Sequence, residues 1–220
     1  MNTPASRQGN LVRMTIFALI YLIVFGVKYL AINVLQGNLW GWILLILFAA
    51  IGLWFYIRQF NHEDHFFERP QRWSLLTSFT VVVGAILLIT AARIMIAYLT
   101  MKQRLPENYL EKFYLQHEAT RLFWLLILSQ GLITPVMQTY LTVGFFFNYW
   151  FRDSDLVNAV MGIIVSGILF MLLHWQLSVP LLIINALLGM LLAWTYLYTQ
   201  NLAITIFLAI INGLLQVVLF

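Results

Sequence analysis

Seven apolar segments of about 20 residues each follow one another along the chain, and they limit its possible folds more than any other feature. They cover residues 11–32, 39–57, 74–99, 122–150, 156–175, 179–198 and 201–220. A helix of about 20 apolar residues is long enough to cross the hydrocarbon core of a bilayer. Only 9% of the residues are charged, whereas a soluble domain has about 25%. We therefore predict an all-α polytopic membrane protein with about seven transmembrane helices.

Two basic residues, Lys28 and Arg93, lie inside the predicted spans. Each is close to the end of its segment, so we expect its long side chain to reach the membrane interface. The first apolar segment is too long for the apolar part of a signal peptide and lacks an Ala-x-Ala-like end. It is therefore expected to remain as a spanning helix.

The longest polar connection, residues 100–121, suggests a division of the chain. From Pro106 onward the pattern predicts an amphipathic helix that lies in the interface plane, because Leu110, Phe113 and Tyr114 share one face. Residues 1–121 would then form an N-terminal membrane region with three spans and this interfacial helix. Residues 122–220 would form a second region with four spans.

The distribution of basic residues predicts a cytoplasmic N-terminus, because cytoplasmic loops carry an excess of Lys and Arg. The basic residues on the N-terminal side are Arg7, Arg13, Arg58, Arg69, Arg72 and Arg152, and those on the other side are Lys102, Arg104, Lys112 and Arg121. No basic run with interleaved aromatic residues is present, so nucleic acid is not an expected partner.

The fourth span is longer than a bilayer requires, and Gly131 and Pro135 interrupt it. Proline removes a backbone donor, so this helix is expected to be tilted, kinked or split into two pieces. Gln138 and Thr139 follow Pro135 by one turn, and Gln138 shares a helix face with Thr142.

Further polar residues lie in the spans that follow, and none of the polar residues in these helices is acidic. Phe170 and His174 share one face of the fifth span, and Ala209, Asn212 and Gln216 form a stripe on the last. Taken singly, the amides are explained by hydrogen bonds between helices, worth roughly 0.6 kcal/mol per pair. Taken singly, His174 is explained by a backbone or water partner near the interface.

Taken together, these residues resemble the motifs of the CPBP family, also called the Abi or CAAX-processing and bacteriocin-processing membrane proteases. The family motifs are Glu-Glu-x-x-x-Arg-Gly after a proline, Phe-x-x-x-His, and His-x-x-x-Asn or Asp. The resemblance covers residues 122–214. Phe170 and His174 match the second motif in full, and Gly144 matches the end of the first.

The other motif positions depart from the family. Gln138 and Thr139 stand at the paired glutamates, Val143 stands at the arginine, Ala209 stands at the third-motif histidine, and Asn212 lies one position before the expected amide, where Gly213 stands. In the family, a glutamate is expected to activate a water, while histidines and an asparagine shape the site or hold a metal. A general base needs a basic lone pair, which a glutamine amide lacks. A catalytic zinc needs about three protein ligands of histidine or carboxylate type, and one histidine remains.

The resemblance therefore implies a CPBP-like helix bundle without a confident catalytic residue, cofactor or metal. It favours a pseudoprotease of the cell membrane, in a bacterial plasma membrane, that acts as a scaffold, regulator or bacteriocin-immunity-type protein. Its expected partners are membrane lipid and a membrane or cell-envelope protein. The alternative is an active CAAX- or bacteriocin-processing endopeptidase with relocated catalytic groups. A small lipid or peptide transporter has little support, because no inverted repeat is apparent.

A further pair of histidines, outside these motifs, is a candidate metal site. His62 and His65 flank Glu63 and Asp64 in a loop of mixed charge and could bind a metal. Their spacing is not that of a His-Glu-x-x-His site, so a solvated turn is the favoured interpretation. Cysteine is absent, which excludes disulfides and thiolate metal sites.

Overall fold

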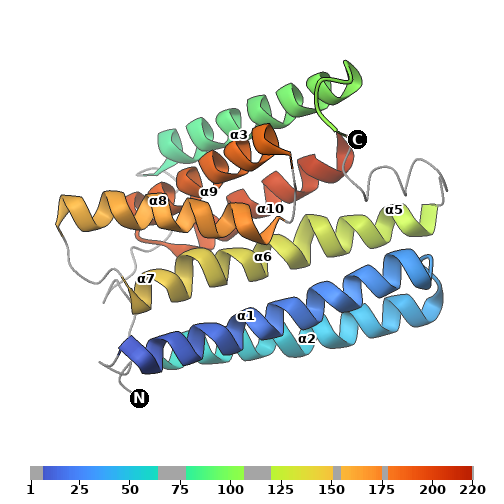
Figure 1. The fold of residues 1–220 in the computed structure, drawn as a ribbon, viewed down its shortest axis with the longest axis horizontal. Helices are drawn as coiled ribbons and strands as arrows, with labels where there is room; N and C mark the ends of the chain where they lie inside the picture. The colour runs from blue at the N-terminus through green and yellow to red at the C-terminus, as the bar shows by residue number, and fades with distance from the viewer. Residues whose placement is uncertain (1–6, 64–77, 107–119, 151–154, 175–177, 220) are drawn as a thin grey trace.

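The computed structural model describes residues 7–63, 78–106, 120–150, 155–174 and 178–219, and within these ranges the regular structure is entirely helical (Figure 1). Helix α1 (Arg7–Tyr29) continues into the π-helical turn η1 (Leu30–Val34), and α2 (Leu39–His62) runs back beside it. Helix α3 (Phe79–Met101) follows. The last three helices are α8 (Leu156–Leu173), α9 (Val179–Thr199) and α10 (Leu202–Val218).

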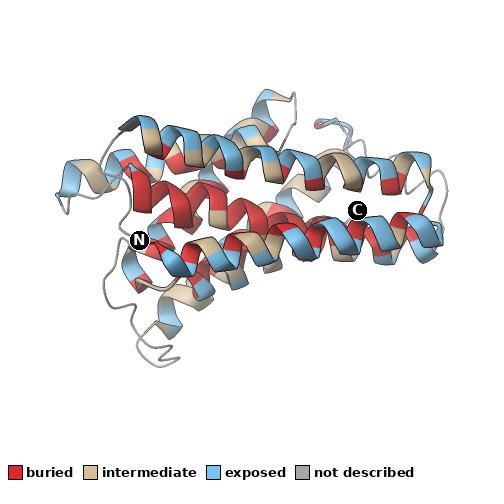
Figure 2. Ribbon diagram, turned by 90° about the horizontal axis from the view of Figure 1, so that it is seen from below, coloured by how far each residue is buried: buried red, intermediate tan, exposed pale blue. Residues whose placement is uncertain are grey.

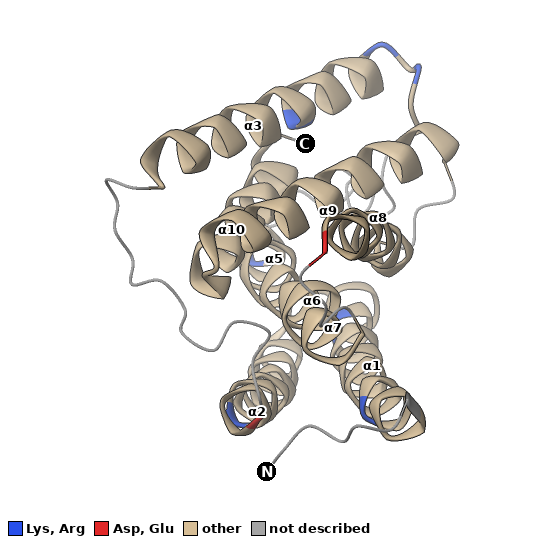
Figure 3. Ribbon diagram, turned by 90° about the vertical axis from the view of Figure 1, so that its left-hand side faces the viewer, with Lys and Arg blue, Asp and Glu red and all other residues tan. Residues whose placement is uncertain are grey.

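The helical membrane class is confirmed. Six helical stretches in the described ranges are long and apolar enough to cross a bilayer, and α10 is a seventh, shorter apolar helix. Large apolar side chains face outward along these helices, with exposed fractions of 51% for Leu47, 65% for Leu87 and 58% for Leu187. Figure 3 shows how sparse charged residues are along the ribbons. Lipid is the solvent that such an outer surface suits.

The fourth predicted span is the central helix of the bundle. It comprises α5 (Thr120–Leu126), η2 (Ile127–Ile133), α6 (Thr134–Thr139), η3 (Tyr140–Phe145) and α7 (Phe146–Tyr149) without a break. In its most apolar part 67% of the residues are buried, against 17–50% in the other spans. Figure 2 shows this helix buried along most of its length. It therefore forms the core against which the other helices pack.

The central helix is neither split nor interrupted at Pro135, because two π-helical segments flank the proline. Proline cannot donate a backbone hydrogen bond, and its ring crowds the carbonyl of the preceding turn. The wide turn of η2 ends immediately before α6, which carries Pro135 near its start. Such π-helical turns accommodate irregular backbone within a continuous helix.

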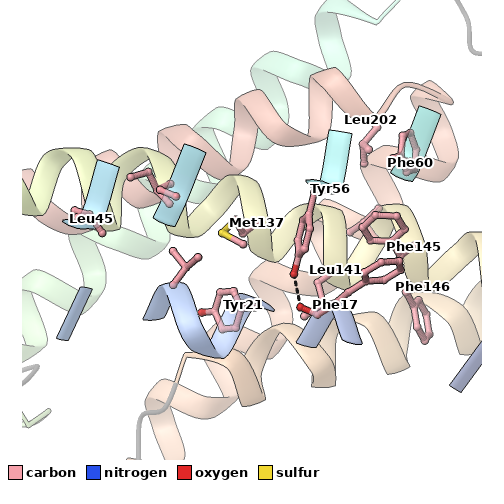
Figure 4. Packing of buried hydrophobic residues seen from close by; sticks show 14 of the residues in the cluster. Phe17, Tyr21, Leu45, Tyr56, Phe60, Met137, Leu141, Phe145, Phe146 and Leu202 are labelled. Atoms are coloured by element: carbon pink, nitrogen blue, oxygen red, sulfur yellow. Dashed lines mark hydrogen bonds between the residues drawn. The ribbon is translucent and has the colours of Figure 1, made fainter. Parts of the chain in front are cut away.

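Two apolar clusters hold the bundle together. On one side, α1 and α2 pack on the central helix through aromatic rings: Phe17 stacks on Phe145 at 4.2 Å between centroids, and Tyr56 meets Phe145 edge-on at 5.5 Å. The Tyr56 hydroxyl donates to the Phe17 carbonyl at 2.6 Å (Figure 4). On the other side, Phe170 and Leu208 belong to a second cluster between α3, α8, α9 and α10. The central helix is thus enclosed from both sides (Figure 1).

Helices α8 and α9 approach each other through glycines. A Cβ added to Gly167 would lie 2.7 Å from the Ala186 carbonyl oxygen, and one added to Gly189 would lie 2.9 Å from the Gly167 Cα. Small residues allow such close approach of helix backbones in membranes. This contact fixes α8, and with it the position of His174 at its end.

Several sequence-based expectations stay predictions. The interfacial helix from Pro106 falls on residues 107–119, outside the described ranges, as do His65 and His117. The division between residues 1–121 and 122–220 and the cytoplasmic side of the N-terminus also stay predictions.

Candidate functional site

Gln138, at the first-motif position, is buried, and its side-chain NH₂ group donates two hydrogen bonds. Its Nε2 donates to the Tyr21 hydroxyl at 2.9 Å and to the Leu173 carbonyl at 3.3 Å. The Tyr21 hydroxyl in turn donates to the same Leu173 carbonyl at 3.3 Å. This triangle joins α1, the central helix and the end of α8. A carboxylate has no hydrogen to donate at that place, whereas an amide has two.

Thr139 and Val143, at the other first-motif positions, take part in packing. The Thr139 hydroxyl is fully buried and donates to the Pro135 carbonyl of its own helix at 2.8 Å. Val143 lies in the aromatic cluster around Phe145. Neither side chain supplies a base or a charge. Ser166, also in the interior, donates to the Thr142 carbonyl at 2.8 Å and has no histidine beside it among the contacts of the described residues.

His174 follows the last residue of α8, and its ring lies tilted against the Phe170 ring, with 4.5 Å between ring centroids. Its Nδ1 lies 3.0 Å from the Phe170 carbonyl oxygen. A carbonyl only accepts, so Nδ1 carries the proton and the lone pair of the neutral ring is on Nε2. Because Gln138 contacts Leu173, the residue before His174, the first and second motif positions lie side by side.

The residues at and beside the third-motif positions contact neighbouring helices. Ala209 is fully buried in the cluster that contains Phe170. Asn212 is turned toward α3, where its Oδ1 accepts from Arg93 Nε at 2.8 Å. A Cβ added to Gly213 would lie 2.5 Å from Pro135 Cγ and 2.7 Å from the Gln130 carbonyl oxygen. No side chain fits at Gly213 without moving the central helix.

Arg93 and Lys28 are buried in the bundle, with exposed fractions of 5% and 4%. The expectation that they reach the interface is wrong. Each meets amide groups on a neighbouring helix: Arg93 binds Asn212 and also donates to Gln216 Oε1 at 3.3 Å. Lys28 Nζ donates to Gln130 Oε1 at 2.8 Å. Each cation thus has neutral polar partners inside the bundle.

The described part of the chain contains no group of three His, Cys, Asp or Glu residues that could hold a metal ion. Its two carboxylates lie away from His174. Glu63 pairs with Arg13 at 3.3 Å and accepts from the Tyr149 hydroxyl. Asp155 precedes α8, whose opposite end carries His174, about 27 Å away along the helix axis. His62 is exposed, and its Nδ1 contacts the Arg58 carbonyl at 2.7 Å.

The site thus brings together Gln138 and His174 but offers one imidazole lone pair and no acidic group beside it among the described residues. Sequence reasoning identified these positions and the Asn212–Gln216 stripe. It missed the burial of Arg93 and Lys28 and the participation of Gln130. The available signal was that three amide residues, Gln130, Asn212 and Gln216, occur in two apolar segments, while two other apolar segments contain the cations Lys28 and Arg93.

Comparison with known proteins supports the motif interpretation. Residues 120–215 match the family model of type II CAAX prenyl endopeptidase Rce1-like proteins. The match confirms the resemblance over the central helix and α8, α9 and α10. No curated protein and no solved structure matches the chain.

Proposed function

Since residues 120–215 match the model of the Rce1-like CAAX prenyl endopeptidases, we propose that this membrane protein keeps the family's helix arrangement but binds a partner rather than cutting it. The observation that carries the proposal is the role of Gln138. At the position of the first-motif glutamate, an amide donates hydrogen bonds to Tyr21 and to the Leu173 carbonyl. The position is used to join three helices.

A general base must offer a basic lone pair close to the water that it activates. Gln138 has none, and the other first-motif positions, Thr139 and Val143, are engaged in packing. Ala209 and Gly213 stand at the third-motif positions, and the adjacent Asn212 binds Arg93. What supports a binding role is the combination of the family-model match over residues 120–215 with side chains that stabilise the bundle at the motif positions. The partner would be a membrane or cell-envelope protein, and the role that of a scaffold, regulator or immunity-type protein.

The binding role predicts that affinity purification of the full chain from native membranes in mild detergent recovers one dominant membrane protein. A matched preparation of an unrelated polytopic protein should not recover it. Quantitative mass spectrometry of the two eluates is the measurement. Recovery of no enriched protein in repeated preparations would contradict the proposal.

Gln138→Glu alone is expected not to create peptidase activity and to lower the free energy of unfolding by about 1–3 kcal/mol. An ionised glutamate at this place would be repelled by the Leu173 carbonyl oxygen. A protonated glutamate could donate to that oxygen. In neither case is it a free base. Thermal unfolding in detergent and cleavage of a prenylated peptide are the measurements. Gln8→Glu, at an exposed position of α1, is the matched control. Cleavage by Gln138→Glu would show that the rest of the site is competent.

An active endopeptidase is the second candidate, and His174 is the observation that favours it. Its Nδ1 is held by the Phe170 carbonyl, so the Nε2 lone pair is available to a water or a metal. Peptidase activity of the purified chain that disappears in His174→Ala would establish this function. We expect no cleavage above the level of His174→Ala, and no stoichiometric zinc by elemental analysis.

A further inference from the structure

Two cations lie in one connected hydrogen-bond network inside the bundle. Lys28 Nζ donates to Gln130 Oε1 at 2.8 Å, and it lies 3.5 Å from the Thr134 hydroxyl. Gln130 Nε2 donates to Gln216 Oε1 at 3.4 Å, and Arg93 donates to the same oxygen at 3.3 Å. The network thus crosses from α1 through the central helix to α10 and α3.

Among the residues that the structure describes, the network carries positive charge without an acidic group. Every contact that Lys28 and Arg93 make with described polar residues is to a neutral amide or hydroxyl oxygen. The salt bridge between described residues, Arg13–Glu63, involves neither of them. A charged residue inside a membrane protein is normally paired or functional, because an unpaired charge at mid-membrane costs about 2.5–3.5 kcal/mol even by insertion scales. The two cations therefore call for a negative partner.

The network is also rich in donors. An ammonium and a guanidinium together carry more N–H groups than the four hydrogen bonds that they make with described residues. The oxygens of Asn212 and Gln216 both accept from Arg93, so their NH₂ groups face away from it and remain as further donors. A ligand that complements this arrangement must be rich in acceptors and negatively charged.

The position of the network in the membrane bears on which anion could bind to Lys28 and Arg93. About 9 Å of helix separates Lys28 from Val34, where its helix ends, and about 12 Å separates Arg93 from Met101. Both cations are thus below the surface on the same side of the bundle. Their neighbours Leu30, Ile94 and Met95 are 49%, 53% and 47% exposed on the outer surface of the helices. The outer surface of the helices beside both cations is therefore apolar.

We propose that Lys28 and Arg93 bind a phosphate group, carried by a lipid head group or present as free phosphate. The planar guanidinium of Arg93 can offer paired N–H donors to phosphate oxygens, and Lys28 adds a point charge. The amides of Gln130, Asn212 and Gln216 orient both cations. This inference is independent of the proposed partner and of whether the chain cleaves peptides.

The test measures lipid binding to the full chain by native mass spectrometry and in nanodiscs, with phosphatidylglycerol and phosphatidylcholine as probes. We expect the chain to prefer phosphatidylglycerol by about tenfold, since charge-assisted hydrogen bonds distinguish an anionic from a zwitterionic head group. Lys28→Gln and Arg93→Gln should each bring the preference close to one, while Lys28→Arg should keep it. Arg104→Gln is the matched control, because Arg104 is exposed just beyond α3.

Inorganic phosphate is the second probe. If millimolar phosphate raises the unfolding temperature of the chain but not of Lys28→Gln, the ligand includes free phosphate. If only phosphatidylglycerol binds, the ligand is a lipid head group. Should Arg93→Gln fail to fold, Lys28→Gln and Lys28→Arg decide the result. Equal binding of both lipids with no effect of phosphate, or a preference unchanged in Lys28→Gln, would overturn the proposal.

Discussion

Gly213→Asn is expected to destabilise the protein by about 3 kcal/mol or more, although it places an amide where the family's third motif has one. A Cβ at this position would lie 2.5 Å from Pro135 Cγ and 2.7 Å from the Gln130 carbonyl oxygen. Both are parts of the central helix that cannot rotate away. The larger asparagine side chain can be accommodated only if α10 and the central helix separate, which would also disturb Gln130 and Gln216.

The matched control for this prediction is Gly84→Asn, because a Cβ at Gly84 in α3 meets nothing within 4 Å. Asparagine and glycine differ little in helix propensity, by a few tenths of a kcal/mol, so this variant should unfold near the wild-type temperature. Thermal unfolding in detergent, followed by circular dichroism, is the measurement. Equal stability of Gly213→Asn and Gly84→Asn would refute the packing argument and show that the third motif can be restored in place.

The composition predicted the helical membrane class, because only lipid suits so apolar a surface. The family motifs also drew attention to positions of the central helix and α8, and the structure places Gln138 against Leu173, the residue before His174. For the fourth span the sequence predicts a helix that is tilted, kinked or split. Sequence alone could not decide this, since the wide turns around Pro135 are defined by how neighbouring helices pack on the backbone.

Lys28 and Arg93 show the limit of sequence reasoning more clearly. A cation near the end of a span can either reach the interface or turn inward, and the local sequence is compatible with both. The deciding partners are far along the chain: Gln130 lies 102 residues from Lys28, and Gln216 lies 123 residues from Arg93. Only the arrangement of α1, α3 and α10 around the central helix brings them together.

The double variant Lys28→Met/Gln130→Met is expected to raise the free energy of unfolding by about 1–3 kcal/mol. Burial of Lys28 without an acidic partner among the described residues is unfavourable, and its hydrogen bonds to Gln130 and Thr134 are made with neutral oxygens. Methionine has a similar length and is flexible enough to fill the same space. Replacing both members of the pair avoids leaving the Gln130 oxygen without its donor.

Lys102→Met is the matched control, since Lys102 is exposed at the end of α3 and should change stability by no more than about 0.5 kcal/mol. Denaturant or thermal unfolding of the three proteins in the same detergent is the measurement. A gain in the double variant would mean that the buried cation is kept at the expense of stability, as is common for residues that bind a ligand. A loss would mean that Lys28 and Gln130 stabilise the bundle themselves, and the burial of Lys28 would then no longer argue for a phosphate ligand.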